Sequence, residues 1–532
     1  MSLRICRSVC VAFGFILAGV GLLLGFYVFP LLVNQQVDDT MKLVNGTEAY
    51  ERWETLPIPL QFKVYFFNVS NPDEVQNGAK PIVKEVGPYV YDEYRHKYDI
   101  TEDEDDTFSY NQTQLFSFNE NASKPNKEDD NIIVAHLPLM VISLMAEKRL
   151  MSELLGTVVS HLFDNPKNVF LTTTVKKFLF DGVNINCSNG DGTVRLICNQ
   201  IRRNAPAQLK VPDKGVDGPF VFSLLSYKNN THDGRYKVSS GVKDISTLGE
   251  IYAWKNSSTV DAWKPNGTCN NIYGTDTTIF PPHRTQLSRV NVFQSDICRT
   301  VNLHYNDETE YKNIKGLRFV VEKDMLLSGA NYSANKCYCL KETKGINGED
   351  GCLLDGALEL YRCQNVPLVL TFPHFYLAHE KYRDSVEGLN PDKTKHEIFV
   401  ELEPVSKANI YKFFYTHAIC SSGCIDKTDS CILSKSGTVL RGSKRVQFNI
   451  FYRPIHGINL TNKLAHSLMP VFWIDEGVEL DDSNINLLYD SLVYPMKILD
   501  GVYWTLIGLG LAIGLISMVW CMLFAHKPKH LF

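Results

Sequence analysis

The sequence has little imbalance of charge. Its 54 lysines and arginines are set against 59 aspartates and glutamates, which leaves a net charge of −5 over 532 residues. We therefore expect no nucleic-acid partner, because binding to a polyanion needs a basic surface. The 44% content of hydrophobic residues is too high for a disordered chain. Internal repeats and low-complexity linkers are also missing, so no boundary divides the long central region.

Signatures of enzymes are missing as well. The sequence contains no G-x-S-x-G elbow and no Walker loop, and His379-Glu380 lacks the second histidine of a zinc motif. Cys337 and Cys339 are closer together than the usual zinc-binding pair. His374, between proline and phenylalanine, is more typical of a core histidine than of a general base. We predict no enzymatic activity, metal or cofactor; an ectoenzyme stays the alternative, because a catalytic triad need not be local in sequence.

Two long apolar runs without charge are present, at residues 9–29 and 502–525. Each is long enough to cross a hydrocarbon layer of about 30 Å as a helix. The first run exceeds the core of a signal peptide and is not followed by a small-x-small cleavage site, so we predict an uncleaved anchor. The runs contain the pairs Gly21/Gly25 and Gly510/Gly514. Such pairs let two spans, or a span and another chain, pack closely.

Positive charge lies on the outer side of both runs. Arg4 and Arg7 precede the first run, and Lys527 and Lys529 follow the second. Because positive residues mark the cytoplasmic side, we predict a cell-membrane protein with two spans and cytoplasmic tails at residues 1–8 and 526–532. Residues 30–501 then form an extracellular domain that binds the ligand.

Modification signals agree with this topology. Eleven of the 14 cysteines lie between the spans, as expected in an oxidising compartment. The other three, Cys6, Cys10 and Cys521, are either span residues or sites of S-palmitoylation. Ten Asn-x-Ser/Thr sequons, the predicted glycosylation sites, also lie between the spans: Asn45, Asn68, Asn111, Asn121, Asn186, Asn229, Asn256, Asn266, Asn331 and Asn459.

The central region combines strands with one helical stretch. Alternation of apolar and polar residues predicts strands at 60–69, 397–404 and 445–452. From Met140 to Leu162 the apolar residues instead have helical spacing and include several methionines. This stretch is either a core helix or an adaptable surface for lipid-like ligands. The acidic run at 101–113 lacks the spacing of a calcium loop and predicts a solvated loop.

Several longer segments carry a family resemblance. With two spans and a large glycosylated domain, "NGTCNNIYGTDTTIFPP", "EVGPYVYDEY", "GLNPD", "VELEPVS" and "PVFWIDEGVEL" resemble the class B scavenger receptor family. The matching segments extend over nearly the whole chain. "WETLPIPLQFKVYFFNVSNPDEVQNGAKPIVKEVGPYVYDE" is most similar to the insect sensory neuron membrane proteins.

The resemblance implies a fold and a function. The fold would be an α+β domain with an irregular antiparallel β-barrel, helices at the end far from the membrane and an internal hydrophobic tunnel. The function would be non-enzymatic capture of hydrophobic odorants, pheromones or lipids and their transfer to the membrane or to a receptor in chemosensory tissue. An odorant receptor and soluble odorant-binding proteins would then be partners. A general scavenger receptor for lipids or particles is the alternative within the family.

The resemblance also implies residue roles. It selects the disulfides Cys269–Cys337, Cys298–Cys363 and Cys339–Cys352, with Cys187–Cys198 as a fourth, local pair. The rigid segment "CNNIYGTDTTIFPP" would then be framework around these disulfides. Lys167 is the nearest match to a lysine that assists acidic lipids where ligands enter; the alternative is a solvated loop lysine.

One segment departs from the family pattern. Residues 407–436, which contain Cys420, Cys424 and Cys431, look like an insertion between "EPVS" and "GTVLRG". The segment is either a genuine loop with its own cysteine pairing or a translated intron, and we favour the intron slightly.

Overall fold

The computed structural model describes residues 2–188, 190–213, 216, 218–265, 267–341, 343–349, 351–403 and 437–525. The predicted insertion at 407–436, the sequon Asn266 and the tail 526–532 lie outside the described residues. Cys6 lies in a helix whose side chains are described from Val9 onward.

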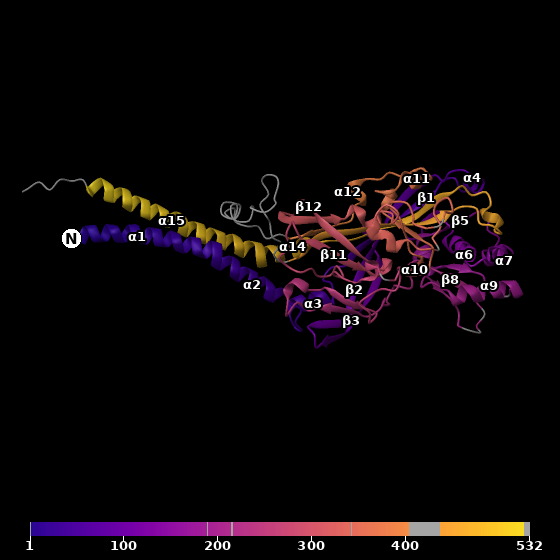
Figure 1. Ribbon diagram of the computed structural model, residues 1–532, viewed down its shortest axis with the longest axis horizontal. Coiled ribbons are helices and arrows are strands. Elements are labelled where there is room, and N and C mark those ends of the chain that lie inside the picture. The colour runs from indigo at the N-terminus through magenta and orange to yellow at the C-terminus, as the bar shows by residue number, and fades with distance from the viewer. Residues whose placement is uncertain are drawn as a thin grey trace, which may run out of the picture.

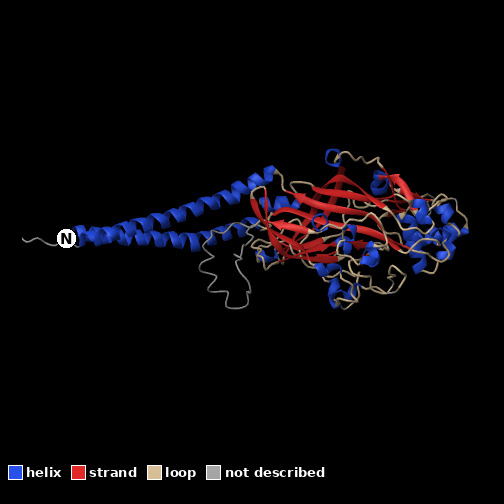
Figure 2. Cartoon of the chain, turned by 90° about the horizontal axis from the view of Figure 1, so that it is seen from above, coloured by secondary structure: helices blue, strands red, loops and turns tan. Residues whose placement is uncertain are grey.

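Each end of the chain forms a long helix that leaves the body of the protein on the same side (Figure 1; Figure 2). At the N-terminus, α1 (Ser2–Leu23), a π-helical turn (Leu24–Val28) and α2 (Phe29–Met41) follow one another without a break. At the C-terminus, α14 (Asp482–Leu488), a π-helical turn (Tyr489–Val493) and α15 (Tyr494–Ala525) do the same. Both helices are long and apolar enough to cross a membrane, and both extend beyond the predicted spans.

The two spanning helices pack against each other through small residues. A Cβ added to Gly510 would lie 2.4 Å from the backbone nitrogen of Ala18, and one added to Gly25 would lie 2.5 Å from the ring of Tyr503. No side chain fits in so little space, so the backbones are in direct contact. The glycine pairs of the sequence therefore join the two spans to each other.

The body of the protein is built on one antiparallel sheet of 13 strands, which curls into a nearly closed barrel (Figure 1). The main path runs β10-β9-β3-β2-β1-β18-β17-β16-β13-β12-β11, and β14 and β15 attach through β17. The strands are β1 (Leu60–Val69), β2 (Val83–Asp103), β3 (Thr107–Phe118), β9 (Tyr236–Ser239), β10 (Ile251–Trp254), β11 (Arg289–Gln294), β12 (Arg299–Tyr311), β13 (Ile314–Val321), β14 (Leu358–Glu359), β15 (Val369–Thr371), β16 (Phe399–Leu402), β17 (Val439–Tyr452) and β18 (Ser467–Glu479).

The edge strands β10 and β11 are joined by the segment Gly274–Thr275, which lies inside "CNNIYGTDTTIFPP". Ile251 of β10 donates its backbone N–H to the Gly274 carbonyl, and Thr275 exchanges backbone hydrogen bonds with Asn291 and Phe293. Gly274 has φ +87°, and a Cβ there would lie 2.5 Å from the Asn291 carbonyl. Only glycine suits this position, because L side chains rarely adopt that φ and no space is free. The rigid segment thus closes the barrel.

The alternation predicted in two strands is confirmed, with one difference. In β1, Phe62, Val64 and Phe66 are buried on one face. In β17, Gln447 and Asn449 face away from the barrel, yet both are fully buried. Another layer covers that face: Gln447 accepts a hydrogen bond from the backbone of His374, and Asn449 donates to the Val369 carbonyl.

Helices cover the end of the barrel far from the membrane helices (Figure 2). The predicted helical stretch is divided into α6 (Leu137–Lys148), α7 (Ser152–Gly156) and α8 (Val159–Leu162). Leu150, with φ +56°, breaks it, because a right-handed helix cannot continue through that conformation. The other helices are α3 (Glu48–Glu54), α4 (Pro72–Gln76), α5 (Glu120–Ser123), α9 (Gly192–Arg203), α10 (Tyr361–Gln364), α11 (Glu380–Arg383) and α12 (Lys393–His396), and two small sheets, β4 (Asn131–Ala135) with β5 (Phe170–Thr174) and β6 (Val183–Ile185) with β8 (Phe220–Phe222) and β7 (Leu209–Lys210), complete the domain.

The acidic run at 101–113 is not a loop. It forms the end of β2, a short turn and much of β3. Asp103 and Asp105 form ion pairs with Lys237 on the neighbouring strand β9, at 3.7 and 3.1 Å. Neutralised in this way, acidic residues can form the tip of a hairpin.

Candidate ligand-binding cavity

The barrel encloses a mostly apolar cavity of about 200 Å³. The inward side chains of two neighbouring strands line it in layers, because β17 and β18 are paired in register. Phe448 lies opposite Phe472, Val446 opposite Ile474 and Lys444 opposite Glu476. From the helical end towards the membrane end, the lining therefore changes from aromatic to aliphatic to charged.

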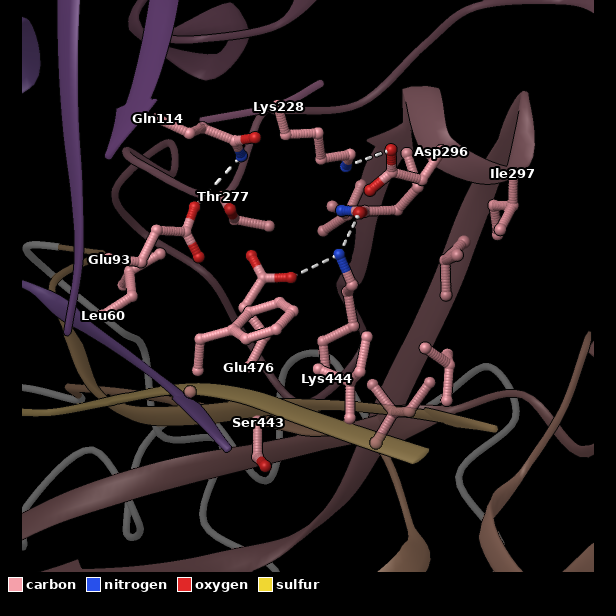
Figure 3. A pocket seen from close by; sticks show the side chains of 18 of the residues that line it. Leu60, Glu93, Gln114, Lys228, Thr277, Asp296, Ile297, Ser443, Lys444 and Glu476 are labelled. Carbon is pink, nitrogen blue, oxygen red and sulfur yellow. Dashed lines mark hydrogen bonds and ion pairs between the residues drawn. The ribbon is translucent and has the colours of Figure 1, made fainter. Parts of the chain in front are cut away.

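The charged layer combines residues from five separate parts of the chain (Figure 3). Arg95 of β2 donates to Glu93 on its own strand, with Nε 2.7 Å from Oε1, and also to Glu476. Lys444 forms an ion pair of 2.5 Å with Glu476 and donates to Gln294 of β11 at 3.0 Å. Lys228 and Asp296 form a further ion pair on the same wall. We call these six residues with charged side chains, Glu93, Arg95, Lys228, Asp296, Lys444 and Glu476, the polar layer.

The pKa values of the two glutamates in the polar layer are shifted in opposite directions. Burial alone raises the pKa of Glu476, but Lys444 and Arg95 outweigh burial and bring this pKa down to about 2. Burial also raises the pKa of Glu93, and here the nearby Arg95 does not compensate fully. Glu476 is thus firmly ionised, whereas Glu93 holds a proton more readily than an ordinary glutamate.

A second, smaller cavity of about 80 Å³ lies among the helices α6, α7 and α9. Val141, Met145 and Met151 of the predicted helical stretch line it, while Leu139 and Leu144 belong to the core. The interpretation as core helices is confirmed, and contact of the cavity-lining residues with a lipid-like ligand stays a prediction. Val366 lines both cavities, so the two cavities approach each other at this residue.

A basic residue lines the helical cavity, but it is not Lys167. Arg149, at the end of α6, is half-buried in the cavity wall. Lys167 is exposed in the loop between α8 and β5 and is not among the lining residues. Sequence patterns did not identify Arg149, because its place in the cavity wall depends on the end of α6 and the break at Leu150.

The described residues form four disulfides, which are the three pairs that the resemblance implies and the expected local pair. Cys269–Cys337, Cys298–Cys363 and Cys339–Cys352 lie together beside the barrel, and Cys187–Cys198 connects α9 to the preceding strand. At the membrane helices, the side chain of Cys10 is exposed and that of Cys521 is half-buried, and both are free thiols.

The predicted glycosylation sites differ in accessibility. Asn68, Asn111 and Asn229 are half-buried. The side-chain oxygens of Asn68 and Asn229 accept backbone hydrogen bonds from Ile133 and Phe116. Six sites are exposed and remain the stronger predictions: Asn45, Asn121, Asn186, Asn256, Asn331 and Asn459.

His374 is a buried histidine with structural partners. Its Nδ1 accepts the backbone N–H of Asn390 at 3.0 Å, so Nε2 carries the proton and donates to Glu85 at 2.6 Å. Its ring stacks on His396 at 4.7 Å between centroids. Burial lowers the pKa of His396 to about 4, with His374 adding to the effect. Both ring nitrogens of His374 are thus engaged in holding the fold together.

A comparison with known proteins agrees with this architecture. A sequence profile of the CD36 family matches residues 12–410 and 428–521. The chain belongs to the CD36 family. The unmatched residues 411–427 fall within the predicted insertion. The neighbouring strands also favour a short connection in the CD36 fold, because Leu402 at the end of β16 lies opposite Val439 at the start of β17.

Curated relatives of this CD36-family chain cover nearly its full length. Sensory neuron membrane protein 2 of Anopheles gambiae is 35% identical, over 96% of this chain and 92% of the relative. The protein of the same name from Aedes aegypti is 34% identical, over 90% and 92%. Sensory neuron membrane protein 1 of Plutella xylostella is 30% identical, over 96% and 89%. The chain is thus a two-span membrane receptor of the class B scavenger receptor family.

Proposed function

We propose that the protein captures a hydrophobic odorant, pheromone or lipid at its helical end and passes it through the barrel towards the membrane, without a chemical reaction. The main support is the position of the two cavities. They share Val366, and the lining of the barrel cavity extends to Val439 and Val478. These two residues lie at the ends of β17 and β18 nearest the membrane helix α14.

The physical basis is the burial of apolar surface. Each CH₂ group that leaves water is stabilised by about 0.8 kcal/mol. A ligand with a long alkyl chain therefore stays in an apolar path until it reaches the lipid. In this proposal the helical end faces the medium and both termini are cytoplasmic. Soluble odorant-binding proteins deliver ligand to the helical end, and an odorant receptor beside the membrane helices receives it after it has passed through the barrel.

A positively charged side chain at the entrance of the helical cavity would favour acidic ligands during capture. Lys167 stays one proposal for this role, and Arg149 is a second, because it lines the helical cavity. Capture of a fatty acid by the Lys167→Ala and Arg149→Ala variants distinguishes them. The variant that lacks the residue acting at the cavity entrance should capture less fatty acid at low salt but as much neutral ester as the wild-type protein. Low salt is needed because screening weakens exposed charges.

The proposed path can be tested by blocking it with a large side chain. Val366→Trp fills the boundary between the cavities, and we expect uptake of a fluorescent fatty alcohol into expressing cells to fall to the level of cells without the protein. Val242→Trp is the matched control, because Val242 is 46% exposed and lies away from both cavities. Surface labelling shows that both variants reach the membrane. Unchanged uptake by a plugged protein at the surface would contradict the path. Expression confined to chemosensory tissue supports the sensory role over general scavenging.

A further inference from the structure

One oxygen of the polar layer has no hydrogen-bond partner among the described residues. Glu93 lines the barrel cavity and is 1% exposed. Its Oε1 accepts two hydrogen bonds, one from Arg95 Nε at 2.7 Å and one from Gln114 Nε2 at 3.0 Å, and the second is drawn in Figure 3. Its Oε2 is buried and makes no hydrogen bond to the described residues. A buried carboxylate oxygen without a hydrogen bond is costly, so this atom is suited to a partner that enters the cavity.

We propose that Glu93 Oε2 binds the hydroxyl group of a long-chain alcohol, whose alkyl chain lies along the apolar layers of β17 and β18. The proposal rests on the proposed function and names the class of ligand for the barrel. The lining continues from the charged pair Lys444–Glu476 to the aliphatic and aromatic layers, as an amphiphile requires. Phe448 and Phe472 stack with their centroids 4.9 Å apart and form the apolar wall.

A hydroxyl group suits this oxygen better than the other common head groups. In its ion pair with Arg95, Glu93 is a carboxylate whose Oε2 can only accept, so a hydroxyl can donate to it, whereas an ether oxygen also only accepts a hydrogen bond. A fatty acid would place a third carboxylate beside Glu93 and Glu476. The cations Arg95 and Lys444 already form ion pairs with these two glutamates. Like charges in a buried site repel strongly, so an acid admitted at the mouth is not retained here.

The test measures preference between matched ligands. The full-length protein in lipid nanodiscs is incubated with radiolabelled dodecanol, dodecyl methyl ether, dodecanoate or dodecane, and retention by empty nanodiscs is subtracted. We expect wild-type protein to retain dodecanol about tenfold more strongly than the ether, since hydrogen bonds to charged groups are worth about 1.5–3 kcal/mol. Dodecanoate should be retained less than dodecanol.

The Glu93→Gln variant should abolish the preference between alcohol and ether. Its amide N–H₂ donates to either ligand, while its carbonyl still accepts from Arg95. A ratio of two ligands on one protein does not change when part of the sample is misfolded. Glu102→Gln is the control, because Glu102 is an exposed glutamate on the same strand, and it should keep the wild-type ratio.

Three results would overturn the proposal in different ways. Equal retention of dodecanol and the ether by wild-type protein would show that Oε2 binds water or nothing. A preference that survives in Glu93→Gln would place the hydroxyl elsewhere. In both cases retention of dodecane would leave the apolar path intact. If the protein retains none of the four probes better than empty nanodiscs do, both the proposed function and the binding of a hydroxyl group by Glu93 are refuted.

Discussion

Replacing Asp276 with asparagine removes the counter-charge of a buried lysine at the point where the barrel closes. Lys97 is 1% exposed, and its Nζ lies 3.6 Å from the Asp276 carboxylate and 2.8 Å from the Trp53 carbonyl. Burial lowers the pKa of Lys97 to about 8, although Asp276 opposes this effect. At neutral pH the pair is therefore ionised. Asp276 also accepts from the Tyr110 hydroxyl at 2.6 Å, so it connects the Gly274–Thr275 segment to β3.

The magnitude follows from breaking a buried pair. Removing one partner typically destabilises a protein by about 3–5 kcal/mol. Deprotonation limits the lysine's share of this loss, because Lys97, with a pKa of about 8 in the folded protein, becomes neutral at pH 7 for about 1.4 kcal/mol. The hydrogen bonds from Tyr110 and Thr278 to a charged acceptor are also lost, and such bonds are worth about 1.5–3 kcal/mol. We expect Asp276→Asn to lower the free energy of unfolding by about 3–4 kcal/mol, measured by urea titration in detergent with tryptophan fluorescence. Trp53 reports directly, because Lys97 Nζ lies 5.1 Å from its ring centre.

The pH dependence gives a second, independent check. In wild-type protein the lowered pKa of Lys97 makes stability rise with pH above about 8, because the unfolded lysine still binds its proton. In Asp276→Asn the pKa of Lys97 falls further, below 7, so the variant gains stability from pH 7 upward. The difference between the proteins should narrow by about 1 kcal/mol from pH 7 to pH 8, because Lys97 of the wild-type protein is itself half deprotonated at pH 8.

The controls decide whether the ion pair is responsible. Lys97→Met with Asp276→Asn should be more stable than Asp276→Asn alone, because no buried charge is left unpaired. Lys84→Met removes an exposed lysine from the same strand and should have little effect. A double variant no more stable than Asp276→Asn, or a difference that does not change with pH, would refute the reasoning.

Three further predictions concern the membrane helices and the predicted insertion. Gly510→Leu should force the spans apart and reduce the amount of protein at the cell surface, whereas Gly508→Leu should not, because no atom lies within 4 Å of a Cβ at Gly508. Tags on either terminus should be invisible to antibodies on intact cells, and glycosidase should lower the apparent mass; labelling without permeabilisation would contradict the topology. Deleting residues 407–436 should leave surface expression intact or improved, and loss of folding would mean that the segment is a genuine loop.

Local patterns in the sequence predicted those parts of the fold that depend on neighbouring residues. Alternation identified β1 and β17, and the uncharged runs identified both membrane helices. The same patterns could not place Leu150, whose positive φ divides the helical stretch, since leucine normally favours helices. Nor could they show that Gln447 is buried, because its partner His374 lies 73 residues away in the chain.

The polar layer and the barrel closure were beyond the reach of sequence patterns for a different reason. Glu93, Lys228, Asp296 and Lys444 lie in different segments and come together only when the sheet curls. Each alone is an ordinary charged residue of a soluble surface. The resemblance correctly implied that "CNNIYGTDTTIFPP" is framework, but the position of Thr275 between two edge strands depends on the closed barrel.

The buried charges of β2 bear on what kind of path the barrel is. Glu93, Arg95 and Lys97 alternate along this strand, and all three are buried; Arg95 and Lys97 have partners far away in sequence. Buried ion pairs seldom stabilise a protein more than apolar residues of the same size would, because desolvation offsets their attraction. An unselective lipid channel would therefore gain nothing from them. A path that selects ligands by their head groups does benefit from such residues. The polar layer, towards its membrane end, favours alkyl chains whose head group is neutral and donates a hydrogen bond.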